Sequence, residues 1–138
     1  MDMAQLVDAA RNGDRDAAWQ IGDLYREARQ GVKYSPKSAF RWYAESALGG
    51  SATGQNNIGA EFENGVGCVQ SFTKAAKWYR LAAAQGFGLA MANLGFLYLN
   101  GYGVKADREE ALRWFKRGAS AGCLKSLRMV KTVLAEDC

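Results

Sequence analysis

The 138-residue sequence contains no histidine. Histidine is the usual base of Ser-His-Asp and Cys-His catalytic sites and a common zinc ligand, so its absence excludes those arrangements. The three cysteines, Cys68, Cys123 and Cys138, are odd in number and lack CxxC spacing, which argues against a disulfide framework or a Cys-only zinc site. No catalytic residue, metal or cofactor is expected, and the protein is predicted not to be an enzyme.

Long apolar runs are also missing, apart from one uncharged stretch at residues 81–104. That stretch includes Gln85, Asn93, Asn100 and five glycines, so it is interpreted as a buried part of a helical protein rather than a membrane span. The N-terminal segment has Asp2 and Asp8 where a secretion signal would be basic and then apolar. The expectation is a cytoplasmic protein with reduced thiols and no membrane insertion.

Proline occurs once, against 16 glycines, which suits many tight turns between helices. The charge is also one-sided: the net charge is +4, and the surplus lies in residues 74–138, with eleven Lys or Arg against five Asp or Glu. Basic surface can attract nucleic acid or anionic lipid, although solvated charges on outward helix faces are the simpler interpretation.

What the sequence does contain is one pattern that occurs three times, at an interval of 36 residues. Three tryptophans mark it, at Trp42, Trp78 and Trp114. Two other sets recur with them at the same interval: Ala39, Ala75 and Ala111; and Gly50, Gly86 and Gly122. Two more sets recur with a first interval of 37 residues and a second of 36: Gly22, Gly59 and Gly95; and Tyr25, Phe62 and Tyr98. Several residue types that recur together at a fixed interval indicate a stacked repeat protein.

Each copy of the pattern predicts two helices joined by a glycine hinge. The first copy has a helix at about 15–28, and the second helices of the three copies are expected at 36–48, 72–84 and 108–120. Ser35, Ser71 and Asp107 stand where an N-cap oxygen would accept hydrogen bonds from free amides. The first hinge has Arg29 in place of a glycine and one extra residue, so we expect it to differ in shape.

Single helices are expected at both ends, at 3–12 and 124–135. In the last one, Leu127, Val130 and Leu134 are predicted to face the core, whereas Lys131 occupies the place of the repeated glycine. Loss of the pattern in a terminal helix is expected of a capping element in a repeat array.

These motifs resemble the Sel1-like repeat family, an α-solenoid relative of the tetratricopeptide repeat. The resemblance is clearest at Leu94–Tyr98, Gly101–Gly103, Asp107 and Ala111–Phe115. It implies an all-α fold: a right-handed α-solenoid of helix-turn-helix repeats, with three full repeats and half-repeat caps. It also implies a protein-interaction role, since family members look like scaffolds and adaptors, often in bacterial envelope, secretion or signalling assemblies.

The predicted organisation is a single domain over residues 1–138. We expect a cap helix at 1–13, repeats at 14–50, 51–86 and 87–122, and a second cap helix at 123–138.

In such a stack the first helix of each repeat lines the concave side. The side chains predicted to bind a partner there are Asp16, Trp19, Asp23, Arg26, Asn56, Glu63, Leu89, Phe96, Leu99, Lys125 and Arg128. Trp19 is outside the repeated tryptophan pattern, which favours an interface anchor. Packing of Trp19 against the N-terminal helix is the alternative, and packing between repeats is the alternative for Phe96 and Leu99.

The predicted function is therefore a non-catalytic protein-protein interaction module, a scaffold or adaptor that binds a protein segment in its concave groove. One alternative is an immunity or regulatory protein that inhibits a partner toxin or enzyme. A minor alternative is nucleic-acid binding through basic residues on the second helices, which lack interleaved exposed aromatics. Homodimerisation through the solenoid ends is a further alternative.

Overall fold

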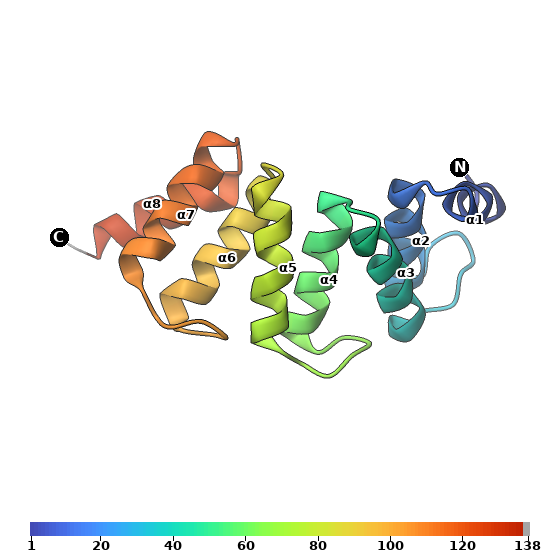
Figure 1. Ribbon diagram of the computed structural model, residues 1–138, viewed down its shortest axis with the longest axis horizontal. Helices are drawn as coiled ribbons and strands as arrows, with labels where there is room; N and C mark the ends of the chain where they lie inside the picture. The colour runs from blue at the N-terminus through green and yellow to red at the C-terminus, as the bar shows by residue number, and fades with distance from the viewer. Residues whose placement is uncertain (137–138) are drawn as a thin grey trace. The chain divides into compact units, whose positions relative to one another are not determined.

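The computed structural model describes residues 1–136, and all regular secondary structure in that range is helical (Figure 1). The chain divides into two compact units, Met1–Ser71 and Phe72–Cys138. The first unit contains α1 (Met3–Arg11), α2 (Arg15–Glu27), α3 (Pro36–Leu48) and α4 (Ala52–Asn64). The second contains α5 (Phe72–Ala84), α6 (Gly88–Asn100), α7 (Arg108–Ser120) and α8 (Leu124–Ala135).

The predicted helix starts at Ser35 and Asp107 are confirmed. The Ser35 side chain accepts a hydrogen bond from the backbone N–H of Ser38, and Asp107 accepts one from Glu110. Pro36 follows Ser35 at the first helical position, where its missing N–H costs nothing. These caps satisfy amides that have no partner within the helix, so they place the start of the second helix in their repeats.

The hinges after α2, α4 and α6 all reverse the chain through left-handed backbone. In the later hinges the residue after the helix is Gly65 or Gly101, with φ of 66° and 70°. In the first hinge that place is taken by Ala28, with φ of 52°, and Gln30 is also left-handed at 55°. The predicted difference in the first hinge is therefore confirmed, but the left-handed cap falls on Ala28 rather than at Arg29.

The repeated glycine of each first helix gives space to an aromatic ring. A Cβ at Gly22 would lie 2.5 Å from the ring of Tyr43, and one at Gly95 would lie 2.6 Å from the ring of Phe115. α2 therefore packs closely on α3 in the first unit, as α6 does on α7 in the second. Both rings are buried, so each glycine determines how closely its two helices approach.

Where a second helix meets the next first helix, the crossing is built from pairs of small residues. In the first unit, Ser46 on α3 faces Gly54 on α4. In the second unit the glycine is on the earlier helix instead: Gly118 on α7 faces Ser126 on α8. A Cβ on either glycine would lie less than 3 Å from the serine side chain, so each crossing has room for only one such side chain.

The burial of Ser126 shows which face of α8 is inside. Val133 is buried at 1% exposure and packs with Ala111 and Phe115, whereas Leu127 and Leu134 are 42% and 43% exposed. The prediction that Leu127 and Leu134 face the core is therefore wrong, while Val130 does pack against this cluster. The cause is that no second helix follows α8 within residues 1–136 to cover that side.

Candidate functional site

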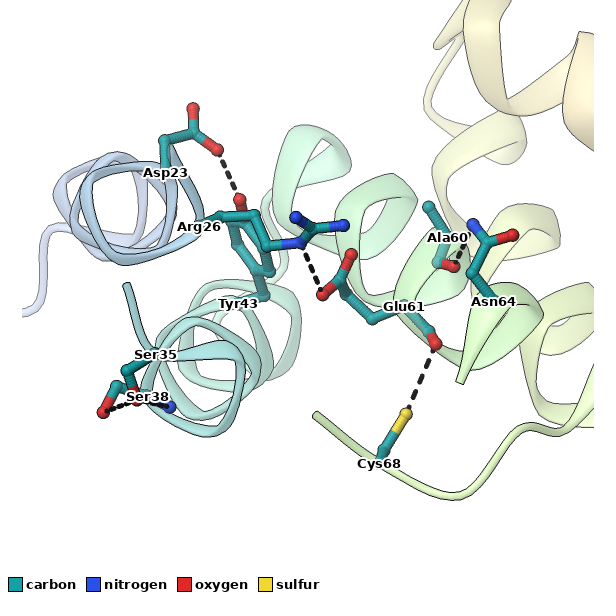
Figure 2. A network of polar contacts seen from close by, with 9 residues as sticks. All are labelled: Asp23, Arg26, Ser35, Ser38, Tyr43, Ala60, Glu61, Asn64 and Cys68. Carbon is teal, nitrogen blue, oxygen red and sulfur yellow. Dashed lines mark hydrogen bonds and ion pairs between the residues drawn. The ribbon is translucent and has the colours of Figure 1, made fainter. Parts of the chain in front are cut away.

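Four polar side chains form a network within the first unit (Figure 2). The hydroxyl of Tyr43 on α3 donates a hydrogen bond of 2.5 Å to Oδ1 of Asp23 on α2. One turn further along α2, Nε of Arg26 donates to Oε2 of Glu61 on α4, at 3.3 Å. The network therefore connects all three helices of this unit that follow α1.

The network places charge where the other repeats are apolar. Glu61 is only 6% exposed, and the equivalent residues of the other repeats are the buried Leu24 and Leu97. Burial raises the pKa of the Glu61 carboxyl, and the nearby Arg26 guanidinium partly opposes this rise. Burial likewise raises the pKa of Asp23, against the hydrogen bond from Tyr43, which stabilises the carboxylate.

The start of α2 carries a second group of polar contacts. Oδ1 of Asp16 accepts hydrogen bonds from Nε1 of Trp19 and from Oγ of Ser51, both at 3.2 Å. Trp19 is half-buried, and it lines a cleft together with Asp23 and with Leu6 of α1. The indole thus borders on the N-terminal helix and still keeps part of its surface open to solvent.

Two further predicted residues of this unit are less accessible. Asn56 on α4 is buried at 5% exposure, and Glu63 is half-buried near the end of the same helix. The predicted polar residues Asp16, Asp23 and Arg26 are held by hydrogen bonds to α3, α4 or the turn between them. The structure therefore brings the α2 residues of the prediction together and leaves Asn56 enclosed.

The second unit has an aromatic surface instead of a polar one. Phe96 on α6 is 37% exposed, and its ring meets the ring of Tyr102 edge to face with centroids 6.1 Å apart. Tyr102, 41% exposed in the hinge after α6, stacks on Phe72 at 4.7 Å. Leu89, two turns before Phe96, is exposed as well. We call Phe72, Leu89, Phe96 and Tyr102 the aromatic surface.

The other predicted residues of the second unit have different surroundings. Leu99 packs against the buried cluster of Ala111, Phe115 and Val133. Nζ of Lys125 donates a hydrogen bond of 2.8 Å to Oδ1 of Asn93, which ties the start of α8 to α6, and Arg128 is exposed.

Sequence reasoning did not select Tyr43, Glu61 or Tyr102 for the candidate site. Two of them carried a usable signal. Glu61 interrupts a series of leucines at equivalent positions, and Tyr102 is the large residue between the two hinge glycines Gly101 and Gly103. The role of Tyr43 depends on which side chain its hydroxyl contacts, and a pattern of aromatic residues does not reveal that partner.

The groups described above make contacts with neighbouring side chains. Asp23 and Glu61 each hold a neighbouring side chain, and the aromatic surface offers ring faces and edges. Among residues 1–136, no group of three or more Cys, Asp or Glu residues lies close enough together to hold a metal ion.

Comparison with known families identifies the repeats. The pattern described as Sel1 repeat matches three consecutive segments, residues 15–51, 52–87 and 88–123. The chain belongs to the Sel1 repeat family. The predicted fold class is confirmed as well: the described chain is all-helical, and its structural relatives are Sel1 repeat solenoids. Sel1 repeat proteins are generally scaffolds for protein-protein interaction and are typically non-catalytic.

Solved Sel1 repeat structures resemble this one closely. A protective antigen of uropathogenic Escherichia coli strains, with the SLR fold, aligns with a TM-score of 0.86 and 29% identity over 91% of this chain. A Sel1 repeat protein from Oxalobacter formigenes aligns with a TM-score of 0.85 and 32% identity over 93%. This chain spans only 27% and 52% of those two proteins.

A third structure shares the fold alone. The cysteine-rich protein B of Helicobacter pylori aligns with a TM-score of 0.70 and 18% identity, over 91% of this chain and 94% of its own length. A search of the curated proteins gave no match. Across residues 1–136, no helix combines the length and the apolar character that crossing a membrane requires.

Proposed function

We propose that this Sel1 repeat protein is a non-catalytic module that binds a segment of a partner protein, in a bacterial cytoplasm. The contacts are made by the first helices of its repeats. In the first unit the contacting residues on α2 are Asp16, Trp19, Asp23 and Arg26. In the second unit those on α6 are Leu89 and Phe96. The family supports the general role, since Sel1 repeats are generally interaction scaffolds.

The observation that carries this proposal is the aromatic surface of the second unit. Phe96 and Tyr102 expose more than a third of their surface, and Leu89 lies exposed on the same helix as Phe96. Neighbouring exposed aromatic and aliphatic side chains are typical of interaction sites, because covering them removes apolar surface from water. Their ring contacts also order them in advance, which lowers the entropy cost of binding.

Site-specific photo-crosslinking tests the proposal. A photoreactive phenylalanine analogue is placed at Phe96 or, as control, at Arg113, which is exposed on α7 of the same unit. After irradiation in an extract of the native cells, we expect a discrete protein adduct from position 96 only. The adduct should weaken at least tenfold when Leu89 and Tyr102 are changed to serine.

Two results would contradict the proposal. One is an identical set of adducts from positions 96 and 113, which would mean random collision. The other is turnover of a small molecule by the purified chain alone, which would make the module an enzyme.

A further inference from the structure

The geometry of the first unit points to a second, more specific site: we propose that the cleft beside Trp19 and Asp23 binds one cationic side chain, arginine or lysine, of the partner polypeptide. We call it the cation cleft. This inference rests on the proposed function, because it names the chemistry of the segment that α2 contacts.

The cation cleft has a volume of about 320 Å³, roughly ten times the share of one water molecule in the liquid, about 30 Å³. Its walls come from three parts of the first unit: α1 with the residues before it, one face of α2, and the first hinge. The lining residues are Met1, Leu6, Trp19, Gln20, Asp23, Leu24, Arg29 and Gln30. Leu6 and Leu24, each only 3% exposed, form the floor of the cleft, and Trp19 and Asp23 supply the aromatic and polar contacts.

The two arginines near the cation cleft have ion-pair partners, whereas Asp23 has none among the described residues. Arg26 forms its ion pair with Glu61 at 3.3 Å, and Arg29 at the rim forms one with Glu27 at 2.6 Å. Asp23 accepts a hydrogen bond from Tyr43, but no lysine or arginine within residues 1–136 lies at ion-pair distance from it. Both arginines near the cleft are thus paired with glutamates, whereas the Asp23 carboxyl has a hydrogen bond but no ion pair among the described residues.

Trp19 and Asp23 are one helical turn apart on α2, so they stand next to each other on the same face. The ring of Trp19 is fixed by the hydrogen bond from its Nε1 to Asp16, and the carboxylate of Asp23 is fixed by the hydroxyl of Tyr43. A cation placed between them would interact with a carboxylate on one side and an indole on the other, and tryptophan is the best aromatic partner for a cation.

Neither residue is part of the common repeat pattern. The positions equivalent to Trp19 hold Asn56 and Ala92, and those equivalent to Asp23 hold Ala60 and Phe96. The repeat fold therefore does not require an indole or a carboxylate at these places. Their coincidence in one repeat, on one cleft, is explained by a ligand that needs both.

The first hinge forms the rim of the cation cleft, and its backbone is unfavourable for the residues that it carries. Gln30 has φ of 55° and lines the cleft, and Ala28, two residues earlier, is also left-handed. Side chains other than glycine pay a steric cost in this region, and such strain gathers at binding sites. The extra residue of this hinge, absent from the other two, thus helps to build the rim.

Nuclear magnetic resonance with small peptides tests the cation cleft directly. The probes are acetyl-Gly-Arg-Gly-amide and the same peptide with citrulline, which has the shape of arginine without its charge. The readout is the indole N–H signal of Trp19, assigned by its disappearance in Trp19→Phe. We expect the arginine peptide to shift this signal in a saturable manner and the citrulline peptide to bind at least tenfold more weakly.

Two charge-removing variants complete the design. Asp23→Asn keeps an oxygen that can accept the hydrogen bond from Tyr43, and it should weaken arginine-peptide binding about tenfold. Asp8→Asn removes the same charge from the exposed face of α1, outside the cation cleft, and should leave binding within twofold. Thermal unfolding of both variants verifies that they are folded.

Equal binding of the two peptides, an unchanged affinity in folded Asp23→Asn, or shifts confined to other tryptophans would overturn the inference. The outcome is separable from that of the proposed function. Crosslinks at Phe96 without arginine binding would refute the cation cleft alone. Arginine binding without a specific crosslink at Phe96 would refute the proposed use of α6 alone.

Discussion

At the scale of single residues, Glu61 has the most unusual position in the first unit. Its backbone position is that of a core leucine, and among residues 1–136 its charge is compensated by one ion-pair partner, Arg26. Removing a carboxylate from water is costly, and one ion pair often fails to recover the whole cost. What Glu61 does provide is a fixed position for the Arg26 side chain, which accounts for a charged residue at a core position.

Replacing Glu61 with leucine is expected to stabilise the protein at neutral pH by about 1–2 kcal/mol, because the Arg26 side chain is 36% exposed and its guanidinium can be hydrated when the carboxylate is gone. Because the pKa of Glu61 is raised in the folded state, its favourable contribution is complete below the unfolded-state pKa, about 4.3, and is lost as the pH rises through the folded pKa. The gain of Glu61→Leu should therefore be larger at pH 7.5 than at pH 4. Urea unfolding at both pH values measures it, with the exposed Glu45→Leu as control.

An equal gain in the free energy of unfolding at both pH values would mean that the burial of the ionised Glu61 carboxylate is not the source of the destabilisation. A larger gain at the lower pH would reverse the sign of the argument.

Gly95 gives a residue-scale prediction in which two effects oppose each other. Alanine is better than glycine inside a helix by about 1 kcal/mol. A Cβ at this position would, however, lie 2.6 Å from the Phe115 ring, and overpacking of this kind costs about 1–3 kcal/mol. We expect Gly95→Ala to destabilise the protein in urea unfolding. The loss should shrink when Phe115→Leu is also present, and a stabilised single variant would show that the ring gives way freely.

At the scale of elements, the three hinges make the same turn with two different residues at the left-handed position. After α4 and α6, glycine takes the left-handed position at the end of the helix. After α2, alanine takes it, and an extra residue follows before the next helix. The cation cleft lies at this irregular hinge, so the strained left-handed backbone is next to the proposed binding site.

The strain predicts a stabilising substitution. Ala28→Gly should raise the free energy of unfolding by about 1 kcal/mol, since left-handed backbone costs an L-residue about 1–2 kcal/mol and glycine loses some of this gain to its greater entropy when unfolded. The reverse change, Gly65→Ala, should lower it by at least as much, because the new Cβ would also lie 3.0 Å from Cβ of Gln70. Calorimetric melting of both variants provides the comparison, and a destabilised Ala28→Gly would contradict the proposed strain.

At the scale of the whole chain, charge is the property that separates the two halves. Residues 1–71 carry seven Lys or Arg and nine Asp or Glu, and the basic surplus lies beyond them. Several of the basic residues considered for nucleic-acid binding are already engaged within the second unit. Arg80 donates to the hydroxyl of Tyr98 at 2.8 Å, Arg113 pairs with Glu110, and Arg117 lies over the ring of Trp114 at 4.4 Å.

Weak and non-selective binding to nucleic acid is therefore expected. Fluorescence anisotropy with a labelled single-stranded RNA should show no saturation below about 100 µM protein at 0.15 M salt, the weak end of non-specific binding. Lowering the salt should bring out binding, with the same strength for DNA and RNA. Saturable binding at micromolar protein and physiological salt would instead favour the nucleic-acid alternative.

The sequence by itself determined the repeats and the positions of the described helices. The period of 36 residues, the caps at Ser35 and Asp107 and the hinge glycines are local signals, and they act through the backbone of the same few residues. Such signals survive without knowledge of distant contacts, which is why the helix bounds and the fold class could be predicted.

Only the tertiary structure decided which side chains meet. The exposed side of α8 depends on whether another helix covers it, so the sequence assigned Leu127 and Leu134 to the core when Val133 is the residue inside. The pairing of Asp23 with Tyr43, and of Arg26 with Glu61, joins residues from separate helices. Burial and partner are properties of the packed chain, and no periodic pattern along one helix contains them.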